Sequence, residues 1–395
     1  MTHEAAPVPA VTAEKIDWIS AGAAMASISV VGICIGLGMP LLSVILEQRG
    51  YSATMIGFNT AFAGVAALAT APLASPLAAR VGVVPAMLIA CAIALVSFAL
   101  FPVFDSFAAW CLLRLSLHGA LSILFILSEY WMSHATPQKS RGLMLGIYAT
   151  TLSLGFAAGP LIFSWTGSGG YLPFSIACLI IMVAAVPLLA AFRKSPDFKG
   201  KDHVPFLPYV WKVPTATAAV LVFGAVETGG MSLLPVYGTH VGYTEAQSAL
   251  LITMIGVGNV LFQIPIGMLS DRVKDRRIVL VVISVLGLVG MLALPYAAAS
   301  WWWTAGLLFL WGGMIAGLYT VGLSHLGAKL TDRELASANA AFIFCYAFGM
   351  LIGPQMIGLG MDLVRPHGFA HVLGGFFAAY IALATWRVAI SRPRG

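Results

Sequence analysis

The chain has 395 residues, of which 60% are hydrophobic and only 9% are charged, and its mean hydropathy is +0.94. A soluble globular protein carries about 25% charged residues, so this composition excludes a water-covered surface of the size that the length implies. It indicates a protein that crosses a membrane many times. The net charge of +6 by itself would fit a nucleic-acid partner, but the placement of the charges is the better guide.

The first 17 residues are polar and lack the basic-then-apolar pattern of a cleaved signal peptide, so we expect the first apolar run to remain as an anchor. Apolar runs of roughly 20 residues then recur, each long enough to cross about 30 Å of hydrocarbon as a helix. A transmembrane barrel would instead show alternating segments of about 10 residues. The sequence predicts an all-α membrane protein with twelve transmembrane helices, at about 18–46, 53–79, 84–104, 107–131, 142–166, 171–192, 213–238, 246–270, 278–299, 302–325, 336–360 and 369–390.

The longest connection between these spans lies near the midpoint of the chain. We expect residues 193–212 to be a cytoplasmic linker between two pseudo-symmetric six-helix bundles, at 18–192 and 213–390. Residues 1–17 and 391–395 are then cytoplasmic tails.

The pattern G-x-x-x-G-P occurs at equivalent places in the two halves, 194 residues apart. Small residues at this spacing let membrane helices approach closely, and the recurrence argues for two related six-helix units. The predicted helix-packing residues are Gly155, Gly159 and Pro160 in the fifth span and Gly349, Gly353 and Pro354 in the eleventh.

The positions of lysine and arginine predict the orientation. With a cytoplasmic N-terminus, eighteen of the 21 basic residues lie inside, Arg49 and Arg365 lie outside, and Arg114 lies within a span. Cytoplasmic connections carry an excess of these residues, so we expect a bacterial plasma (inner) membrane protein with both termini in the cytoplasm. The basic side chains then lie beside anionic membrane lipid, and no nucleic acid is needed to explain them.

A cluster of charged residues, GMLSDRVKDRR at 267–277, stands between the eighth and ninth spans. It is similar to the cytoplasmic-loop signature G-x-x-x-D-R-x-G-R-R of the major facilitator superfamily (MFS) of secondary transporters. The resemblance covers nearly the whole chain, and segments 128–149 and 235–273 look most like the YcaD-type bacterial branch. The motif residues that match are Gly267, Asp271, Arg272 and Arg276.

The resemblance implies a central cavity lined by spans 1, 4, 7 and 10, and a latch that holds the cytoplasmic side shut. In such a latch Asp271 caps the N-terminus of a neighbouring helix and Arg272 bridges to an acid across the loop. The alternative is a basic turn that merely obeys the positive-inside rule. In the first half, Arg80 is kept but Ala79 replaces the acid, so we hypothesise a gating pair between Arg80 and Glu129.

Three ionisable residues lie within predicted spans, where a charge costs about 2.5–3.5 kcal/mol and usually serves a cavity, a pathway or a pair. Two of them, Arg114 and Glu129, lie on one face of the fourth span if successive residues turn by 100°. We expect this largely polar face to meet water or substrate. It consists of Arg114, His118, Ser122, Phe125 and Glu129.

The third residue, Glu227, is expected near the middle of the seventh span, at the depth where transporters bind substrates and coupling ions. Substrate or proton binding, a gating salt bridge and a structurally satisfied acid remain open as its role. Arg114 would hold an anionic substrate group or the Glu227 carboxylate. Thr228 and Tyr319 are further candidate contacts, although aromatic residues in membrane helices mostly pack.

These features predict a secondary active transporter of a small molecule that works by alternating access, with proton coupling through Glu227. Export is favoured over uptake, because G-x-x-x-G-P resembles part of a motif of drug-exporting relatives. A cation would suit Glu227, an organic anion would suit Arg114, and a zwitterion would suit both.

The alternatives are a facilitated-diffusion uniporter, a receptor or sensor, and a membrane-embedded enzyme. The enzyme is disfavoured because neither H-E-x-x-H nor G-x-S-x-G occurs. The five cysteines lack metal or redox spacing. We therefore expect no catalytic residue, metal or cofactor, and a monomer whose partners are its substrate, lipid and the proton.

Overall fold

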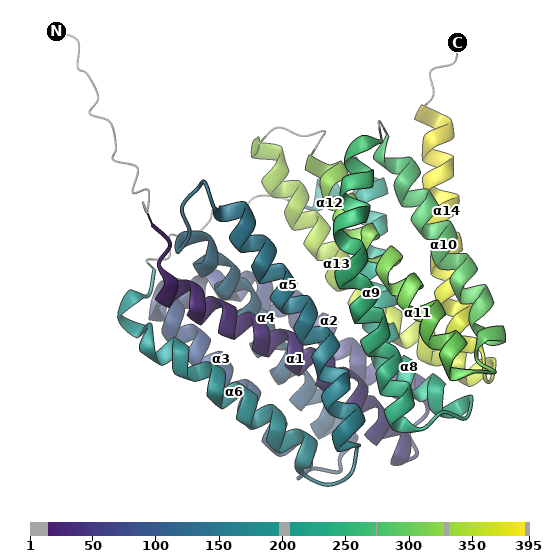
Figure 1. Ribbon diagram of the computed structural model, residues 1–395, viewed down its shortest axis with the longest axis horizontal. Coiled ribbons are helices and arrows are strands. Elements are labelled where there is room, and N and C mark those ends of the chain that lie inside the picture. Colours follow the sequence, from purple (N-terminus) through teal and green to yellow (C-terminus); the bar gives the residue numbers. More distant parts are fainter. Residues whose placement is uncertain (1–14, 197–205, 274, 328–331, 392–395) are drawn as a thin grey trace.

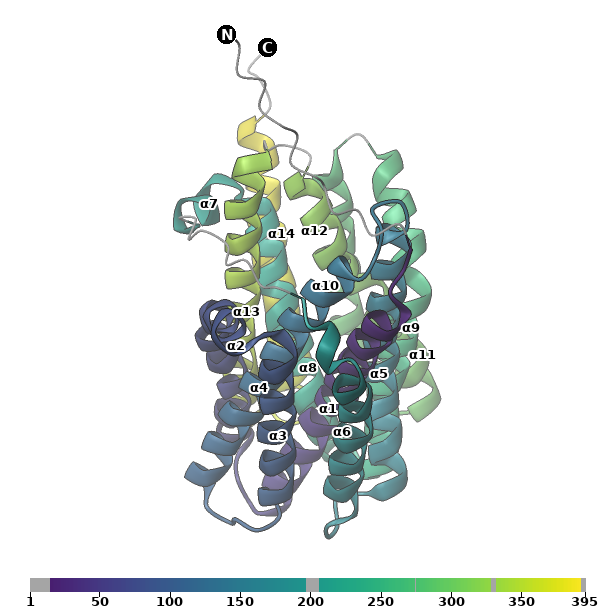
Figure 2. The ribbon, with the colours of Figure 1, turned by 90° about the vertical axis from the view of Figure 1, so that its left-hand side faces the viewer.

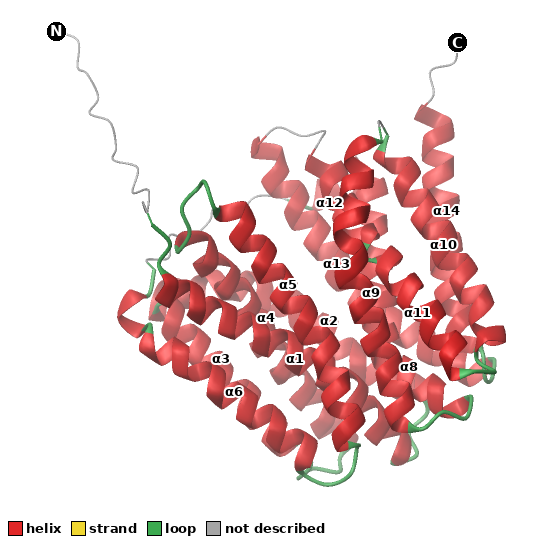
Figure 3. Ribbon diagram, in the orientation of Figure 1, coloured by secondary structure: helices red, strands yellow, loops and turns green. Residues whose placement is uncertain are grey.

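The structure is a computed structural model that describes residues 15–196, 206–273, 275–327 and 332–391. These residues form helices and short connections, with no strand among them (Figure 3). Twelve stretches are long and apolar enough to cross a membrane, as predicted. The elements are α1 (Trp18–Gln48), α2 (Ala53–Val81), α3 (Val83–Leu100), α4 (Phe107–His134), α5 (Arg141–Thr166), α6 (Leu172–Ala190), the 3-10 turn η1 (Phe192–Lys194), α7 (Leu207–Lys212), α8 (Pro214–His240), α9 (Glu245–Arg272), α10 (Arg276–Ala297), α11 (Trp301–Ile315), α12 (Gly317–Gly327), α13 (Asp332–Leu363) and α14 (Gly368–Ser391).

Helices α1–α6 form one bundle and α8–α14 form the other (Figure 1). Because successive spans reverse direction, the start of α1 and the end of α14 lie on one face, which also carries α7 (Figure 2). We call this the terminal face. The opposite, distal face carries the connections 49–52, 101–106, 167–171, 241–244, 298–300 and 364–367.

Two elements differ from the sequence prediction. The tenth span is broken at Ala316 into α11 and α12. The break lies within the glycine-rich stretch WGGMIAG at 311–317, where glycine weakens a helix and where a Cβ on Gly312 would lie only 2.7 Å from the Cα of Ile255. The predicted linker also contains helix α7, whose Lys212 Nζ lies 2.6 Å from Oε1 of Glu334 on α13.

Small residues set the closest helix crossings within each bundle. A Cβ on Gly155 would lie 2.9 Å from the Cα of Gly32, and a Cβ on Gly353 would lie 2.5 Å from the oxygen of Ala225, so neither place admits a side chain. The repeated glycines therefore lie where α5 crosses α1 and where α13 crosses α8. Gly155 and Gly159 face Gly32 and Gly36, and Gly349 and Gly353 face Leu221 and Ala225.

The two bundles meet mainly where α1 contacts α8, α2 contacts α13, and α5 contacts α9. A Cβ on Gly57 would lie 2.7 Å from the carbonyl carbon of Pro354, and Thr253 Oγ1 donates to the oxygen of Ala157 at 3.2 Å. These contacts lie in the distal halves of their helices, and the bundles diverge toward the terminal face (Figure 1). Helices α1 and α8 lie at the centre: 78% and 89% of their most apolar 18-residue stretches are buried inside the protein.

Candidate functional site

Glu227 lies near the middle of α8, in a pocket of about 50 Å³ between the two bundles. The lining comes from α5 of the first bundle and from α8, α9 and α11 of the second, and it includes Phe156, Asn259 and Trp311. Among the described residues that line this pocket, Glu227 alone is ionisable. Glu227 thus lies near the middle of its span, as expected from the sequence, and it lines a pocket.

The partner of Glu227 is a tyrosine of α13. Tyr346 OH donates to Glu227 Oε2 at 2.5 Å, and the close crossing of α8 and α13 brings the two residues together. Tyr346 belongs to an aromatic cluster, in which Tyr319 has its ring centroid 6.1 Å from Tyr346 and 5.8 Å from Phe223. The predicted candidate Tyr319 therefore contacts the partner of Glu227, whereas Thr228 is buried at 3% exposure and does not appear among the described pocket residues.

Arg114 forms a second polar site, on α4 in the first bundle. Its side chain is completely buried, and Nη1 donates to Thr60 Oγ1 at 3.1 Å and to Met39 Sδ at 3.6 Å. The Thr60 hydroxyl lies 2.6 Å from that of Ser232, which lies 2.6 Å from that of Ser43. The arginine is thus tied to α1, α2 and, through hydroxyl groups, to α8 of the other bundle.

Several buried polar atoms around Arg114 have no hydrogen-bonding partner within the described part of the chain. They are Arg114 Nε and Nη2, His118 Nε2 and Asn59 Oδ1. His118 Nδ1 lies 3.0 Å from the backbone oxygen of Arg114, and Asn59 Nδ2 lies 3.3 Å from Cys111 Sγ. Among the described residues, Glu227 pairs with Tyr346 while Arg114 contacts Thr60 and Met39, so the structure does not join Arg114 to Glu227.

The polar face predicted on α4 changes in exposure along the helix. Arg114 and His118 are buried, Ser122 and Phe125 are half-buried, and Glu129 near the terminal face is exposed. This gradient follows the divergence of the bundles toward the terminal face (Figure 1).

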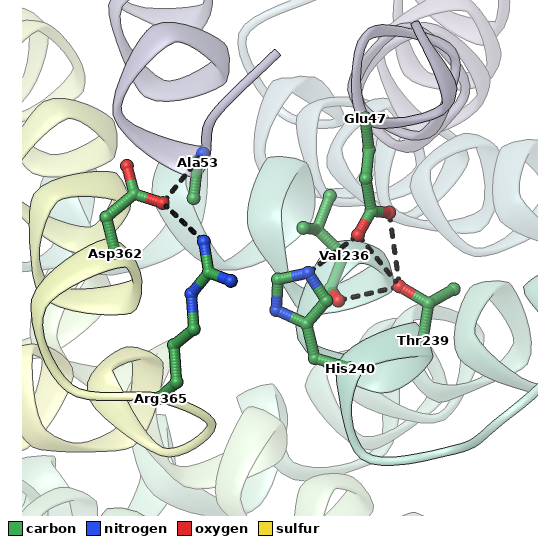
Figure 4. A network of polar contacts seen from close by, with 7 residues as sticks. All are labelled: Glu47, Ala53, Val236, Thr239, His240, Asp362 and Arg365. Atoms are coloured by element: carbon green, nitrogen blue, oxygen red, sulfur yellow. Dashed lines mark hydrogen bonds and ion pairs between the residues drawn. The ribbon is translucent and has the colours of Figure 1, made fainter. Parts of the chain in front are cut away.

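A polar network that the sequence analysis did not name joins the bundles at the distal face (Figure 4). Glu47 at the end of α1 lies 2.7 Å from Nε2 of His240 at the end of α8, and it accepts a hydrogen bond from Thr239 Oγ1 at 3.1 Å. The available signal was an acid and a histidine at the ends of spans, which does not reveal their pairing.

The second part of this network lies where α13 meets α2. The Asp362 carboxylate accepts hydrogen bonds from Ala53 N at 3.2 Å, from Thr54 N at 2.8 Å and from Thr54 Oγ1 at 2.6 Å. It therefore caps the N-terminus of a helix in the other bundle, and Arg365 Nη2 lies 3.8 Å away (Figure 4).

The charged cluster at the terminal face makes different contacts from those expected. Asp271 Oδ1 pairs with Arg276 Nη2 at 3.0 Å, and Arg276 Nη1 donates to the oxygen of Ser324 on α12 at 2.8 Å. The carboxylate that caps α10 is Asp275, which accepts from Arg277 N at 3.0 Å, rather than Asp271. These bonds join residues of α9, α10, α12 and the connection between α9 and α10, so they stay within the second bundle.

The other residues predicted for the latch are not buried. Arg272 is exposed, and apart from the neighbouring backbone of its own helix no described residue lies within 4 Å of a Cβ placed on Gly267. Arg80 and Glu129 are also exposed, and the ion pairs between described residues include none that joins them. Lys274, within the motif, lies outside the described residues.

The sequence model of the Major Facilitator Superfamily matches this chain over residues 24–354 and 216–395. The chain belongs to that superfamily. An MFS-type transporter of Bacillus subtilis, YfkF, is 24% identical over 348 residues, which cover 85% of this chain and 87% of the relative. An MFS-type transporter of Yersinia enterocolitica is 24% identical over 285 residues, or 70% of this chain and 72% of the relative.

Solved structures share the MFS fold at low sequence identity. The nucleoside transporter NupG superposes with a TM-score of 0.73 at 12% identity, covering 93% of this chain and 98% of that one. A bacterial homologue of the human lysosomal transporter Spinster gives 0.68 at 13% identity, with 94% of each chain covered. The twelve-span, two-bundle architecture predicted from the sequence is confirmed by the family match and by these structures.

Proposed function

We propose that this MFS transporter couples the movement of its substrate to protons through Glu227. The observation that carries the proposal is a single carboxyl group in a largely apolar pocket between the bundles, with the Tyr346 hydroxyl 2.5 Å away. The ionised form accepts the hydrogen bond of Tyr346, while the protonated form needs no counter-ion in apolar surroundings. Coupling to protons requires a group that can be both ionised and protonated, and Glu227 lies at the membrane depth where transporters bind substrates and coupling ions.

We propose that the terminal face is cytoplasmic and that the chain lies in a bacterial plasma membrane. The excess of lysine and arginine at that face supports this orientation. The distal face is then external, and its cross-bundle contacts make the described conformation inward-facing. The Spinster homologue, which is inward-facing and occupied in its own structure, supports the assignment of such a state to this fold.

Alternating access then exchanges two sets of contacts. Opening the outside breaks the bonds of Glu47 and Asp362, and closing the inside brings the charged cluster at 267–277 toward the first bundle. We propose that Asp271 and Arg272 act as a latch in that outward-facing state, together with Arg80 and Glu129. Replacing Glu129 with glutamine should then alter the inward–outward ratio measured by spin-label distances; an unchanged ratio would remove the pair from the latch.

Reconstitution in liposomes tests the coupling, using the compound that most stabilises the purified protein in a screen of metabolites and drugs. Glu227→Gln should abolish uphill accumulation and its pH dependence while retaining counterflow of labelled compound. Asp105→Asn, which neutralises an exposed carboxylate of the distal face, is the control and should retain both. A Glu227→Gln protein that still accumulates compound with the original pH dependence would overturn the proposal.

The same vesicles test direction and rival functions. Export, favoured by the likeness of G-x-x-x-G-P to the exporter motif, requires that compound and protons move in opposite directions. Proton entry together with compound would replace export by uptake. Counterflow without proton movement would indicate a uniporter, and an absence of counterflow would favour a receptor, sensor or enzyme.

A further inference from the structure

The guanidinium of Arg114 is buried without a carboxylate partner among the residues that the structure describes. Among the described residues, its hydrogen-bonding partners are the uncharged Thr60 hydroxyl and the Met39 sulfur, and both contact Nη1. Thr60, Ser43 and Ser232 are each 0% exposed, so the surroundings are protein rather than solvent. A buried charge that lacks an opposite charge strongly disfavours the folded state, so this arginine needs a reason other than stability.

The two free nitrogens lie on one edge of the guanidinium. Nε–H and Nη2–H point in the same direction and match the spacing of the two oxygens of a carboxylate, which they bind side-on in a bidentate manner. Nη1 is on the other side of the group and is already bonded to Thr60. The protein thus holds the arginine by one side and leaves the carboxylate-binding edge without a protein acceptor within the described residues.

One helical turn further along α4, His118 presents an acceptor. Its Nδ1 lies 3.0 Å from the backbone oxygen of Arg114. Because a carbonyl oxygen can only accept, Nδ1 carries the proton, and Nε2 of the neutral ring is an acceptor. That Nε2 is buried and has no partner in the described part of the chain, and the same holds for Asn59 Oδ1. The site therefore offers a fork of donors and, beside it, acceptors.

We propose that the transported substrate is a hydroxylated organic acid, whose carboxylate binds the Nε/Nη2 edge of Arg114 and whose hydroxyl donates to His118 Nε2. This inference rests on the proposed transport function and divides the work between the two sites: Glu227 takes the proton and Arg114 takes the anion. Thr60 connects Nη1 of Arg114 to Ser232 of the opposite bundle, so the arginine that binds the anion is also linked to the surface where the two bundles meet.

Thermal denaturation and calorimetry on the purified full chain test this, with lactate as the probe, lactamide as its uncharged match and propionate as its match without the hydroxyl. Chloride and inorganic phosphate are the competing anions. Lactate should raise the melting temperature and lactamide should not. Propionate should bind the parent protein more weakly than lactate does, and His118→Phe should bind the two acids equally. Equal effects of lactate and lactamide, or stabilisation by chloride or phosphate alone, would overturn the proposal.

Substitution of the arginine separates a binding role from a structural one. Arg114→Met should raise the melting temperature of the ligand-free protein, because it removes a charge without a counter-ion, and should weaken lactate binding at least ~10-fold. Arg49→Met is the control: Arg49 pairs with Asp105 at 3.1 Å and lies over Trp110, so its loss should lower stability without affecting lactate. An Arg114→Met protein that is less stable without ligand would show a structural arginine and refute the inference.

Arg114→Lys tests the fork itself, since lysine keeps the charge but not the paired donors. It should lose the preference for lactate over chloride; a lysine variant that keeps this preference would contradict bidentate binding. Transport distinguishes the two proposals. Lactate binding without counterflow in liposomes would refute transport and leave the anion site intact, whereas counterflow of lactate by Arg114→Met at the rate of the parent protein would refute the anion site and leave transport intact.

Discussion

Asp362 is expected to control how firmly the distal face is closed. It lies at the end of α13 and caps α2 of the other bundle, accepting hydrogen bonds from Ala53 N, Thr54 N and Thr54 Oγ1. When the distal face opens, these three donors and the carboxylate are transferred to water. The substitution Asp362→Asn keeps the size of the side chain, removes its charge and exchanges one acceptor oxygen for a donor.

The magnitude follows from the contacts that are lost. Hydrogen bonds to a charged group contribute about 1.5–3 kcal/mol and neutral ones about 0.5–1.5 kcal/mol, and a carboxylate at a helix N-terminus adds about 0.3–1 kcal/mol. Asparagine keeps some of the bonds in weaker form, so we expect a net loss of about 2 kcal/mol from the closed distal face. This corresponds to a roughly 30-fold shift of the population toward the distal-open state.

Distances between spin labels on the distal ends of the two bundles, for example at Val103 and Trp302, measure this population. The matched control is Asp105→Asn, because Asp105 pairs with Arg49 within the first bundle and is 93% exposed. Asp362→Asn should shift the distances to longer values, and Asp105→Asn should leave them unchanged. If both variants gave the distribution of the parent protein, the cap would not hold the bundles together and this reasoning would be refuted.

Three further outcomes are expected. Tyr346→Phe should lower proton-driven accumulation at least ~10-fold with counterflow retained, because the ionised Glu227 loses a charge-assisted bond; equal accumulation rates in liposomes would contradict this. Gly353→Leu should destabilise the protein by about 1–3 kcal/mol or prevent its folding, whereas Gly142→Leu, at a position with open space, should leave the melting temperature nearly unchanged; equal losses would rule out the crossing as the cause. Ser232→Ala should shift the label distances toward the distal-open state by about tenfold, since it removes two buried hydrogen bonds, and no shift would show that these hydroxyls do not hold the bundles.

The sequence alone determined the membrane helices and their grouping, because these depend on local patterns. A span is a matter of apolar length, and its reversal is a matter of short polar connections. The sequence also predicted the close helix crossings at Gly155 and Gly353, because glycines repeated at the same place in each half are typical of helix-packing positions. The break at Ala316 was not predicted. It lies where α11 packs closely against Ile255 of α9, a contact that the sequence does not specify.

The pairing of polar groups was decided only by the tertiary structure. The sequence placed Glu227 and Arg114 in the membrane but left open a bond between them; the crossing of α8 and α13 instead joined Glu227 to Tyr346, 119 residues away. The bond between Asp362 and Thr54, which are 308 residues apart, was not predicted from the sequence and exists only because the fold brings the two residues together. The physical reason is that a polar bond needs its atoms within about 3 Å, and that distance depends on the rotation and axial shift of packed helices, which hydrophobic patterns along one helix do not specify.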